Sequence, residues 1–172
     1  MNTDTKTKGV FIPFEELLAP LEKAVHELRA RGIPDQMFPN DEDSLPRRSM
    51  ELREFRTIGV HAPRQCGATR YTYHSMRKRT LVVVKNTVLR RMFLTNMGED
   101  VDEALQCEVM TLRDVLRLTE APMLKIHQKG VFERVVFLSA SYLFDDIKRS
   151  RIDIYDQLAQ IVSKDCIVVR LN

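Results

Sequence analysis

Two short runs of apolar residues constrain the fold of this chain most strongly. One is Leu81-Val82-Val83-Val84 and the other is Val135-Val136-Phe137-Leu138. Neither run alternates with polar residues, as a strand with one face in solvent would. Strands of this kind are covered on both faces, which is typical of a parallel sheet between two layers of helices. Both runs therefore predict central strands of an α/β domain.

Further strand and helix patterns alternate around these two runs. The predicted strands are Thr57–His61, Thr80–Lys85, Glu108–Thr111, Arg134–Ser139 and Cys166–Leu171. The predicted helices are Gly67–Arg77, Thr87–Asn96, Leu112–Leu118 and Ile152–Val162. This alternation predicts an α/β three-layer sandwich with a mostly parallel five-stranded sheet.

A helical N-terminal extension precedes this region. Apolar residues at helical spacing predict a helix that starts at about Ala19 and stops at Gly32, because Pro13 and Pro20 each suit a first helical turn. The proline-containing and acidic segment that follows is typical of a linker.

Ser49 could cap a short helix through Phe55, just before the first predicted strand. We therefore divide the chain into a helical extension with a linker, residues 1–48, and an α/β domain, residues 49–172. A chain of 172 residues is long enough for one such domain with a sizeable core.

Targeting signals and cysteine patterns limit the function classes. No apolar run approaches the length of a membrane span, and the start MNTDTKTKG lacks the apolar segment of a signal peptide. The cysteines Cys66, Cys107 and Cys166 are far apart and form no C-x-x-C pair, so we expect reduced thiols. The four histidines show no ligand spacing with cysteines or carboxylates. We expect an intracellular protein with no membrane partner.

The charge is distributed unevenly along the chain. The formal net charge is +3, but no acidic residue lies between Glu54 and Glu99. That interval carries nine cations: Arg56, Arg64, Arg70, Arg77, Lys78, Arg79, Lys85, Arg90 and Arg91. It favours an anionic partner such as a nucleotide, a nucleic acid or an acidic protein face. The alternative is a solvated face that the acidic segment from Glu99 to Glu108 balances in three dimensions.

The segment APRQCGAT, residues 62–69, carries the most functional information. Aligned with the phosphate-binding pattern G-x-x-x-x-G-K-[ST], it keeps the second glycine, Gly67, and the hydroxyl residue, Thr69. Ala62 replaces the first glycine and Ala68 replaces the lysine. In a working loop, backbone N–H groups cradle the phosphates, the lysine reaches the β- and γ-phosphates, and the hydroxyl holds Mg²⁺. The backbone N–H groups could therefore still surround a phosphate here, although the lysine is missing.

The loop is predicted to lie between a buried strand and a helix N-terminus, where an anion is favoured. Cationic help would have to come from Arg64 inside the loop or, less directly, from Arg70 on the helix. The candidate nucleotide-binding residues are Pro63, Arg64, Gln65, Cys66, Gly67, Ala68, Thr69 and Arg70, with Thr69 as the candidate magnesium ligand. The alternative is a strand-to-helix turn that binds nothing.

An NTPase also needs an acidic residue at the end of a buried strand to hold Mg²⁺. In this chain Ser139 follows Val135-Val136-Phe137-Leu138, and no glutamate comes after it. Asp145 and Asp146 lie roughly two helical turns farther on if the segment is helical. The chain thus lacks both the lysine of the loop, at Ala68, and the strand-end acid, at Ser139. These two losses of charge argue against hydrolysis, so we assign no catalytic residue.

The stretch REFRTIGVHAPRQCGATRY, followed by TLVVVKNT, resembles the start of the P-loop NTPases of bacteriophages, including the ATPase domains of terminase-like packaging motors. Their loop has the form (A/G)-P-R-Q-x-G-K-T, which Gly67 and Thr69 match and Ala68 does not. The later segments FERVVFLSASYLFDD and DCIVVRLN resemble the acidic strand and the last strand, with Ser139 in place of the acid. The resemblance implies a P-loop fold from about Arg53 onward, a site for ATP or GTP with Mg²⁺ and, for a phage protein, a location in the host cytoplasm.

Three functions remain open from the sequence. The preferred one is a phage-type P-loop protein that has lost hydrolysis and acts as a nucleotide-binding or assembly subunit, with copies of itself or homologous subunits as partners. The second is an active small NTPase or nucleotide kinase in which Arg64 or Arg70 replaces the lysine.

The third function is nucleic-acid binding through the basic interval. Its candidate residues are Arg77, Lys78, Arg79, Arg90 and Arg91. Tyr71, Tyr73 and His74 interleave with cations there, and such a mixture could stack on single-stranded bases. The alternative is an ordinary amphipathic helix whose rings pack on the sheet.

Overall fold

A computed structural model of the protein describes residues 14–32, 36–37, 44–61, 68–75, 79–97, 107–117, 132–140, 143 and 152–172. The strands are β1 (Thr57–Val60), β2 (Thr80–Val84), β3 (Glu108–Thr111), β4 (Phe132–Leu138) and β5 (Val162–Leu171). The helices are α1 (Phe14–Ala30), α3 (Leu45–Phe55), α4 (Ala68–Ser75), α5 (Thr87–Met97), α7 (Leu112–Leu116) and α10 (Ile154–Leu158).

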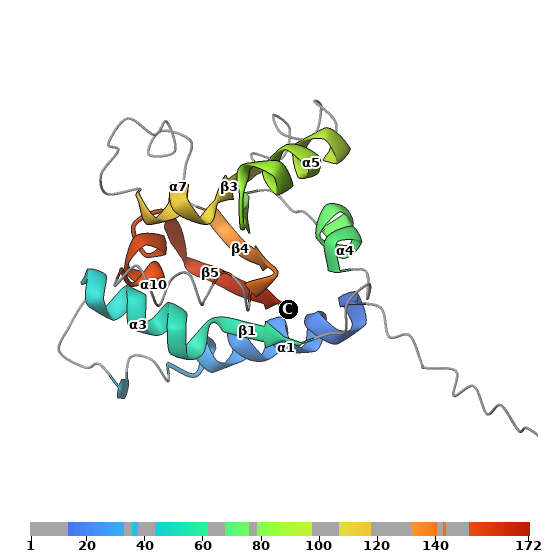
Figure 1. Ribbon diagram of the computed structural model, residues 1–172. Helices are drawn as coiled ribbons and strands as arrows, with labels where there is room; N and C mark the ends of the chain where they lie inside the picture. Colours follow the sequence, from blue (N-terminus) through green and yellow to red (C-terminus); the bar gives the residue numbers. More distant parts are fainter. Residues whose placement is uncertain are drawn as a thin grey trace, which may run out of the picture.

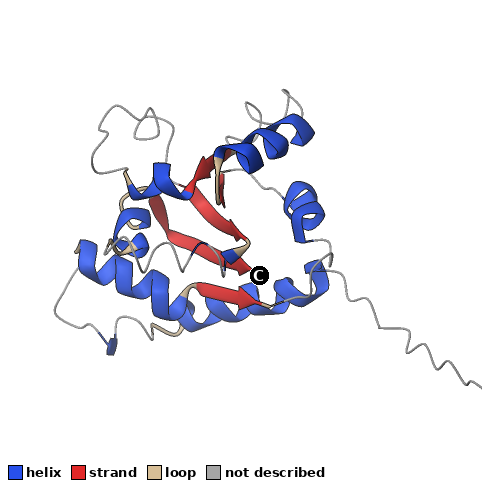
Figure 2. Cartoon of the chain, viewed as in Figure 1, coloured by secondary structure: helices blue, strands red, loops and turns tan. Residues whose placement is uncertain are grey.

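The strands form a single sheet in the order β1-β5-β4-β2-β3, and every pair of neighbours is parallel. Figure 1 shows this sheet at the centre of the molecule, and Figure 2 shows helices around it. The predicted three-layer α/β sandwich is therefore confirmed, and the sheet is fully parallel.

Side chains from the two faces of the sheet form two separate cores. Residues of β1, β2, β4 and β5 meet α1, α4 and α5 on one face, where Phe14, Leu18, Tyr71 and Phe93 are buried. On the other face the sheet meets α3, α7 and α10, and Leu52 is among the buried residues. Because both faces are covered, the central strands β2 and β4 must be apolar on both sides, as their sequences predict.

The N-terminal helix begins earlier than the sequence predicts. It starts at Phe14 instead of Ala19 and runs through Pro20. A proline inside a helix removes one hydrogen bond and crowds the preceding turn. Phe14 and Leu18 are 6% and 1% exposed, and burial of two large side chains of this kind offsets that cost. The prediction was wrong because it treated Pro20 as a first-turn residue.

The cap of α3 also differs from the prediction. Ser44, not Ser49, accepts a hydrogen bond from the backbone N–H of Arg47, and Pro46 lies in the first turn. Ser49 lies inside the helix and is buried. Proline is well suited to a first turn because that position needs no N–H donor.

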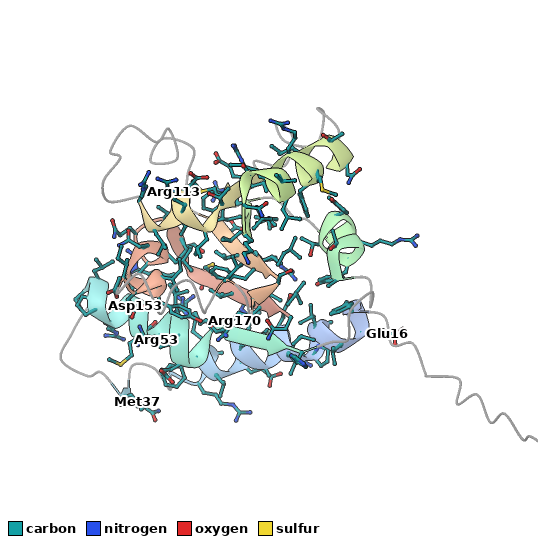
Figure 3. The ribbon with its side chains drawn as sticks, in the orientation of Figure 1. Glu16, Met37, Arg53, Arg113, Asp153 and Arg170 are labelled. Atoms are coloured by element: carbon teal, nitrogen blue, oxygen red, sulfur yellow. The ribbon has the colours of Figure 1, made fainter. Side chains whose placement is uncertain are left out.

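Both ends of the last helix also differ from the prediction. The last helix, predicted over Ile152–Val162, covers only Ile154–Leu158, because Asp153 caps it and β5 already begins at Val162. Asp153 also pairs with Arg53 of α3, whose guanidinium lies 5.4 Å from the centre of the Tyr155 ring. Figure 3 shows Arg53 and Asp153 close together where α3 and α10 meet.

A buried ion pair fixes α1 to the sheet. Arg134 of β4 lies 2.8 Å from Glu22 Oε1 of α1, and both side chains are about nine-tenths shielded from solvent. The same guanidinium donates a 2.8 Å hydrogen bond to the hydroxyl of Tyr71 on α4. Tyr71 in turn stacks on Phe14, with ring centres 5.4 Å apart. One arginine therefore connects two helices with a central strand.

Replacing Glu22 with alanine should destabilise the fold by ~3 kcal/mol, because Arg134 would keep its charge in a buried place without its carboxylate. Urea unfolding followed by circular dichroism measures the change. The matched control is Glu27→Ala on the same helix, whose carboxylate is 53% exposed in its pair with Lys23. That change should cost less than ~0.5 kcal/mol. Equal losses from the two variants would contradict a special role of the buried pair.

Alkaline pH should weaken the fold through Cys166. Burial raises the pKa of this thiol to about 12, whereas an unfolded cysteine has a pKa of about 8.5. Between these values the unfolded chain releases a proton that the folded chain retains, so the free energy of unfolding falls as pH rises. The expected slope from this group is ~1.4 kcal/mol per pH unit.

Comparison with Cys166→Ala isolates this contribution, because the other groups titrate alike in both proteins. The difference in the free energy of unfolding between wild type and variant should narrow or reverse above about pH 9. Parallel curves from pH 7 to 11 would show that the thiol does not titrate in this way.

Candidate functional site

The candidate site lies at the carboxyl edge of the sheet, where all parallel strands end. Strand β1 ends at Val60, His61 is exposed, and α4 begins at Ala68. The strand and the helix on either side of the phosphate-loop pattern are therefore present in the predicted order. Five of the eight predicted nucleotide-binding residues lie outside the described residues: Pro63, Arg64, Gln65, Cys66 and Gly67.

The other three predicted residues, Ala68, Thr69 and Arg70, lie in the first turn of α4. Ala68 is half-buried and packs against the core shared by α1, α4 and α5. Thr69 and Arg70 are both exposed. The position where the family pattern has its lysine thus faces apolar side chains, while the hydroxyl and one cation are accessible from solvent.

The aromatic residues of α4 pack inward. Tyr71 is buried against Phe14, and Tyr73 stacks on Phe93 of α5 with ring centres 4.1 Å apart. Tyr71 is therefore not available to stack on bases, and Tyr73 is half-buried with one face against Phe93. These two rings pack as expected for an ordinary amphipathic helix, whereas the side chain of His74 lies outside the described residues.

Ser139 follows β4 directly, as predicted, and has an unusual backbone. Its φ is 58°, in the left-handed region that residues with a side chain rarely adopt. The side chain is exposed, whereas Ala140 and Leu143 beyond it are buried against the face that carries α10. The turn at Ser139 therefore sends the chain sharply from the sheet edge into that helical layer.

Ser139 follows β4 and His61 follows β1 at the same edge of the sheet, but these two strands are not adjacent. Strand β5 lies between β1 and β4, which places the ends of those two strands roughly 10 Å apart. Ser139 carries no charge, and a hydroxyl alone is a weak replacement for the carboxylate that holds Mg²⁺ in an NTPase.

The sheet also has a topological switch point at this edge. Strands β2 and β4 are neighbours, but the chain leaves β2 for α5 on one face and leaves β4 for α10 on the other. In open parallel sheets, ligands bind where neighbouring strands diverge in this way. The residues at this point are Lys85 and Asn86 after β2 and Ser139 after β4. Asn86 caps α5 by accepting a hydrogen bond from the backbone N–H of Leu89 at 2.9 Å.

The predicted nucleic-acid residues are not equally available. Arg79 pairs with Glu133 at 3.3 Å, and Arg90 donates from Nε to the backbone oxygen of Val109 at 2.7 Å. Arg91 is exposed. Arg77 and Lys78 lie outside the described residues.

A cavity of about 530 Å³ lies at the opposite, amino-terminal edge of the sheet, under α1. Three carboxylates and two arginines line it, together with a histidine, a serine and an isoleucine: Glu22, Glu133, Asp165, Arg79, Arg134, His26, Ser163 and Ile167. Each of these carboxylates already pairs with an arginine, namely Arg134, Arg79 or Arg29. The charges at this edge are thus neutralised internally, which indicates a structural role.

Sequence reasoning missed the network of Glu22, Arg134 and Tyr71. No local pattern could have revealed it, because its members come from α1, β4 and α4 and meet only in the folded chain. Arg134 was visible as a polar residue at the start of an apolar run, which is the one available signal.

Two kinds of feature are absent from the described parts of the chain. No group of three or more histidine, cysteine, aspartate or glutamate side chains could hold a metal ion there. None of the described helices is long and apolar enough to cross a membrane.

Comparison with known proteins gives no family assignment: no protein-family model matches this chain, and neither does any curated protein sequence.

The left-handed backbone at Ser139 leads to a stability prediction. Ser139→Gly should be more stable than Ser139→Ala by ~1 kcal/mol, because only glycine adopts a positive φ without steric cost. Both variants lack the hydroxyl, so their difference reports the backbone alone. Urea unfolding of the two variants measures it, and an alanine variant as stable as the glycine variant would contradict a left-handed turn.

Proposed function

We propose that this protein is a P-loop-like nucleotide-binding subunit that lacks efficient hydrolysis. The observation that carries the proposal is the unit formed by β1, the pattern APRQCGAT and α4 within a fully parallel sheet. Backbone N–H groups at such a strand-to-helix turn favour a phosphate group even without a lysine. ATP or GTP with Mg²⁺ is the proposed ligand.

Two accessible side chains in the first turn of α4 would contact the bound nucleotide and its Mg²⁺. Thr69 is exposed in the first turn, where its hydroxyl would bind Mg²⁺ held by the phosphates. Arg70 is exposed beside it and would supply charge, although it projects from the helix. The half-buried side chain of Ala68 packs against the core and would make no contact with the phosphates.

The absence of hydrolysis in this proposal follows from two residues, one at the start of α4 and one directly after β4. Ala68 supplies no cation, and Ser139 supplies no carboxylate for Mg²⁺ or for the attacking water. Electrostatic stabilisation of the transferring phosphate is the main catalytic contribution in such enzymes. A site without these charges would bind a nucleotide and release it unchanged.

The two other functions have less support. An active enzyme would need Arg70 or Arg64 to replace the lysine and another group to replace the acid. A nucleic-acid module would need free cations, but Arg79 and Arg90 both make contacts within the protein.

Calorimetric titration with ATP and GTP, with and without Mg²⁺, tests the proposal directly. We expect binding that depends on Mg²⁺, with no phosphate release above the background rate. Thr69→Ala should weaken binding about tenfold in the presence of Mg²⁺, since it removes one ligand of the ion. The control is Thr95→Ala, which removes an exposed threonine hydroxyl on α5 that bonds to the backbone oxygen of Arg91.

Three outcomes would contradict the proposal. Steady phosphate release by the wild-type protein would favour the active enzyme. If ~1 mM nucleotide produced neither heat in the titration nor a shift in the unfolding temperature, the turn would be a structural connection that binds no nucleotide. Binding that Thr69→Ala and Thr95→Ala reduce equally would move the nucleotide site elsewhere.

A further inference from the structure

Ion pairs join the walls of the cavity at the amino-terminal edge of the sheet. Its volume of about 530 Å³ is in the range of small-molecule pockets. The pair of Glu22 with Arg134 joins α1 to β4, and the pair of Arg79 with Glu133 joins the residue before β2 to β4. These pairs hold the cavity between α1 and the sheet, but they use only some of the polar atoms around it.

Three hydrogen-bond donors on residues that line this cavity make no hydrogen bond in the described structure: Nε of Arg134, Nε of Arg79 and Oγ of Ser163. Arg134 is the most informative of them, because its side chain is only 7% exposed and its Nη2 already contacts Glu22 and Tyr71. Buried donors are almost always hydrogen-bonded, since an unsatisfied one costs free energy. Three unused donors around one cavity therefore point to a ligand that carries acceptor oxygens.

Two irregular backbone features bring side chains to this cavity. In the pairing of β4 with β5, residues 163–166 of β5 lie opposite the single residue Glu133 of β4. Ser163 and Asp165 of this bulge line the cavity. Arg79, directly before β2, has a φ of 61°, in the left-handed region. Bulges re-aim side chains and are frequent beside functional sites, so this one is consistent with a binding role for the cavity.

Side chains of both charges line the cavity, and they differ in depth. Arg134 lies at the buried end together with its partner Glu22. The carboxylates of Glu133 and Asp165 are 55% and 69% exposed, so they lie near the mouth, where each pairs with one arginine and can accept further hydrogen bonds. His26 also lines the cavity and adds a positive charge only when it is protonated.

This distribution selects the kind of ligand. A simple anion would meet the carboxylates of the cavity, and a simple cation would meet its guanidinium groups. A small molecule with a carboxylate at one end and an ammonium group at the other can use the unused donors at the buried end and the carboxylates at the mouth.

We propose that this cavity binds a small zwitterion of the α-amino-acid type. Its carboxylate accepts hydrogen bonds from Nε of Arg134 and Oγ of Ser163, and its ammonium group faces the carboxylates of Glu133 and Asp165. Binding does not require a nucleotide, because the cavity lies at the opposite edge of the sheet and contains no residue of the candidate nucleotide site.

The size of the ligand limits its affinity. An amino acid has few non-hydrogen atoms, and the mouth of the cavity stays in contact with water, so we expect a dissociation constant on the order of 0.1 mM. A ligand that binds only the folded chain raises its unfolding temperature once the ligand concentration exceeds that constant.

Thermal unfolding of the full chain without nucleotide tests the proposal. The probes are the standard L-amino acids, each added singly at ~2 mM and neutral pH. At least one of them should raise the unfolding temperature, and calorimetric titration then gives its dissociation constant. The carboxyl amide and the N-acetyl form of that amino acid should each bind about tenfold more weakly or worse, because each lacks one of the two charges.

Variants of Ser163 test the position of the ligand. Ser163→Ala removes a hydroxyl that makes no hydrogen bond in the folded chain, so it should weaken binding about fivefold without lowering the unfolding temperature of the free protein. Ser163→Phe should abolish binding, because its ring would fill the cavity. The control is Ser49→Ala, which removes a buried hydroxyl on α3, on the opposite face of the sheet. It should leave binding unaltered.

Three results would overturn the proposal. If no amino acid stabilises the chain, the cavity holds nothing more specific than water. If the amide or the N-acetyl form binds as tightly as the amino acid, the cavity does not recognise two opposite charges. If Ser163→Phe binds as tightly as the wild type, the ligand lies elsewhere. Because no nucleotide is present, a failure of the proposed nucleotide site cannot produce any of these results.

Discussion

Burial of both faces of the parallel sheet is the constraint on which the rest of the structure depends. Val82, Val83, Val135 and Phe137 are fully buried, two on each of the neighbouring strands β2 and β4. A sheet of this kind is stable only when helices cover it on both sides. The chain must then return to the same end of the sheet after each strand, so every strand end, and with it the candidate site, lies at one edge.

Polar side chains in this structure connect the layers that apolar burial creates. Arg134 joins β4 to Glu22 of α1 and Tyr71 of α4, and the stacking of Tyr71 on Phe14 brings these helices together. Helix α4 begins directly after the phosphate-loop pattern and presents Thr69 and Arg70 to solvent. The contacts of Tyr71 with Arg134 and Phe14 therefore hold that first turn in place, on the side of the helix that faces the core.

Local sequence patterns predicted most of the fold and part of the candidate site. The runs in β2 and β4 are long enough and apolar enough to identify central strands, and Ser139 could be placed at a strand end because Leu138 closes its run. The same reasoning failed at Pro20 and Ser49, where tertiary burial of Phe14 and Leu18 extends one helix and Ser44 caps another. It could not detect the left-handed turn at Ser139 either, since a serine gives no signal for a positive φ.

The sequence by itself determined the class of the fold, because continuous apolar strands separated by amphipathic segments have few other stable arrangements. It also determined which charges are missing from the phosphate-loop pattern. Only the tertiary structure decided the strand order, which puts β1 at an edge and one strand away from β4. It also decided that Ala68 faces the core and that α1 and α5 keep apolar sides in solvent. These features depend on contacts between residues far apart in the chain, and such contacts leave no periodic trace in the local sequence.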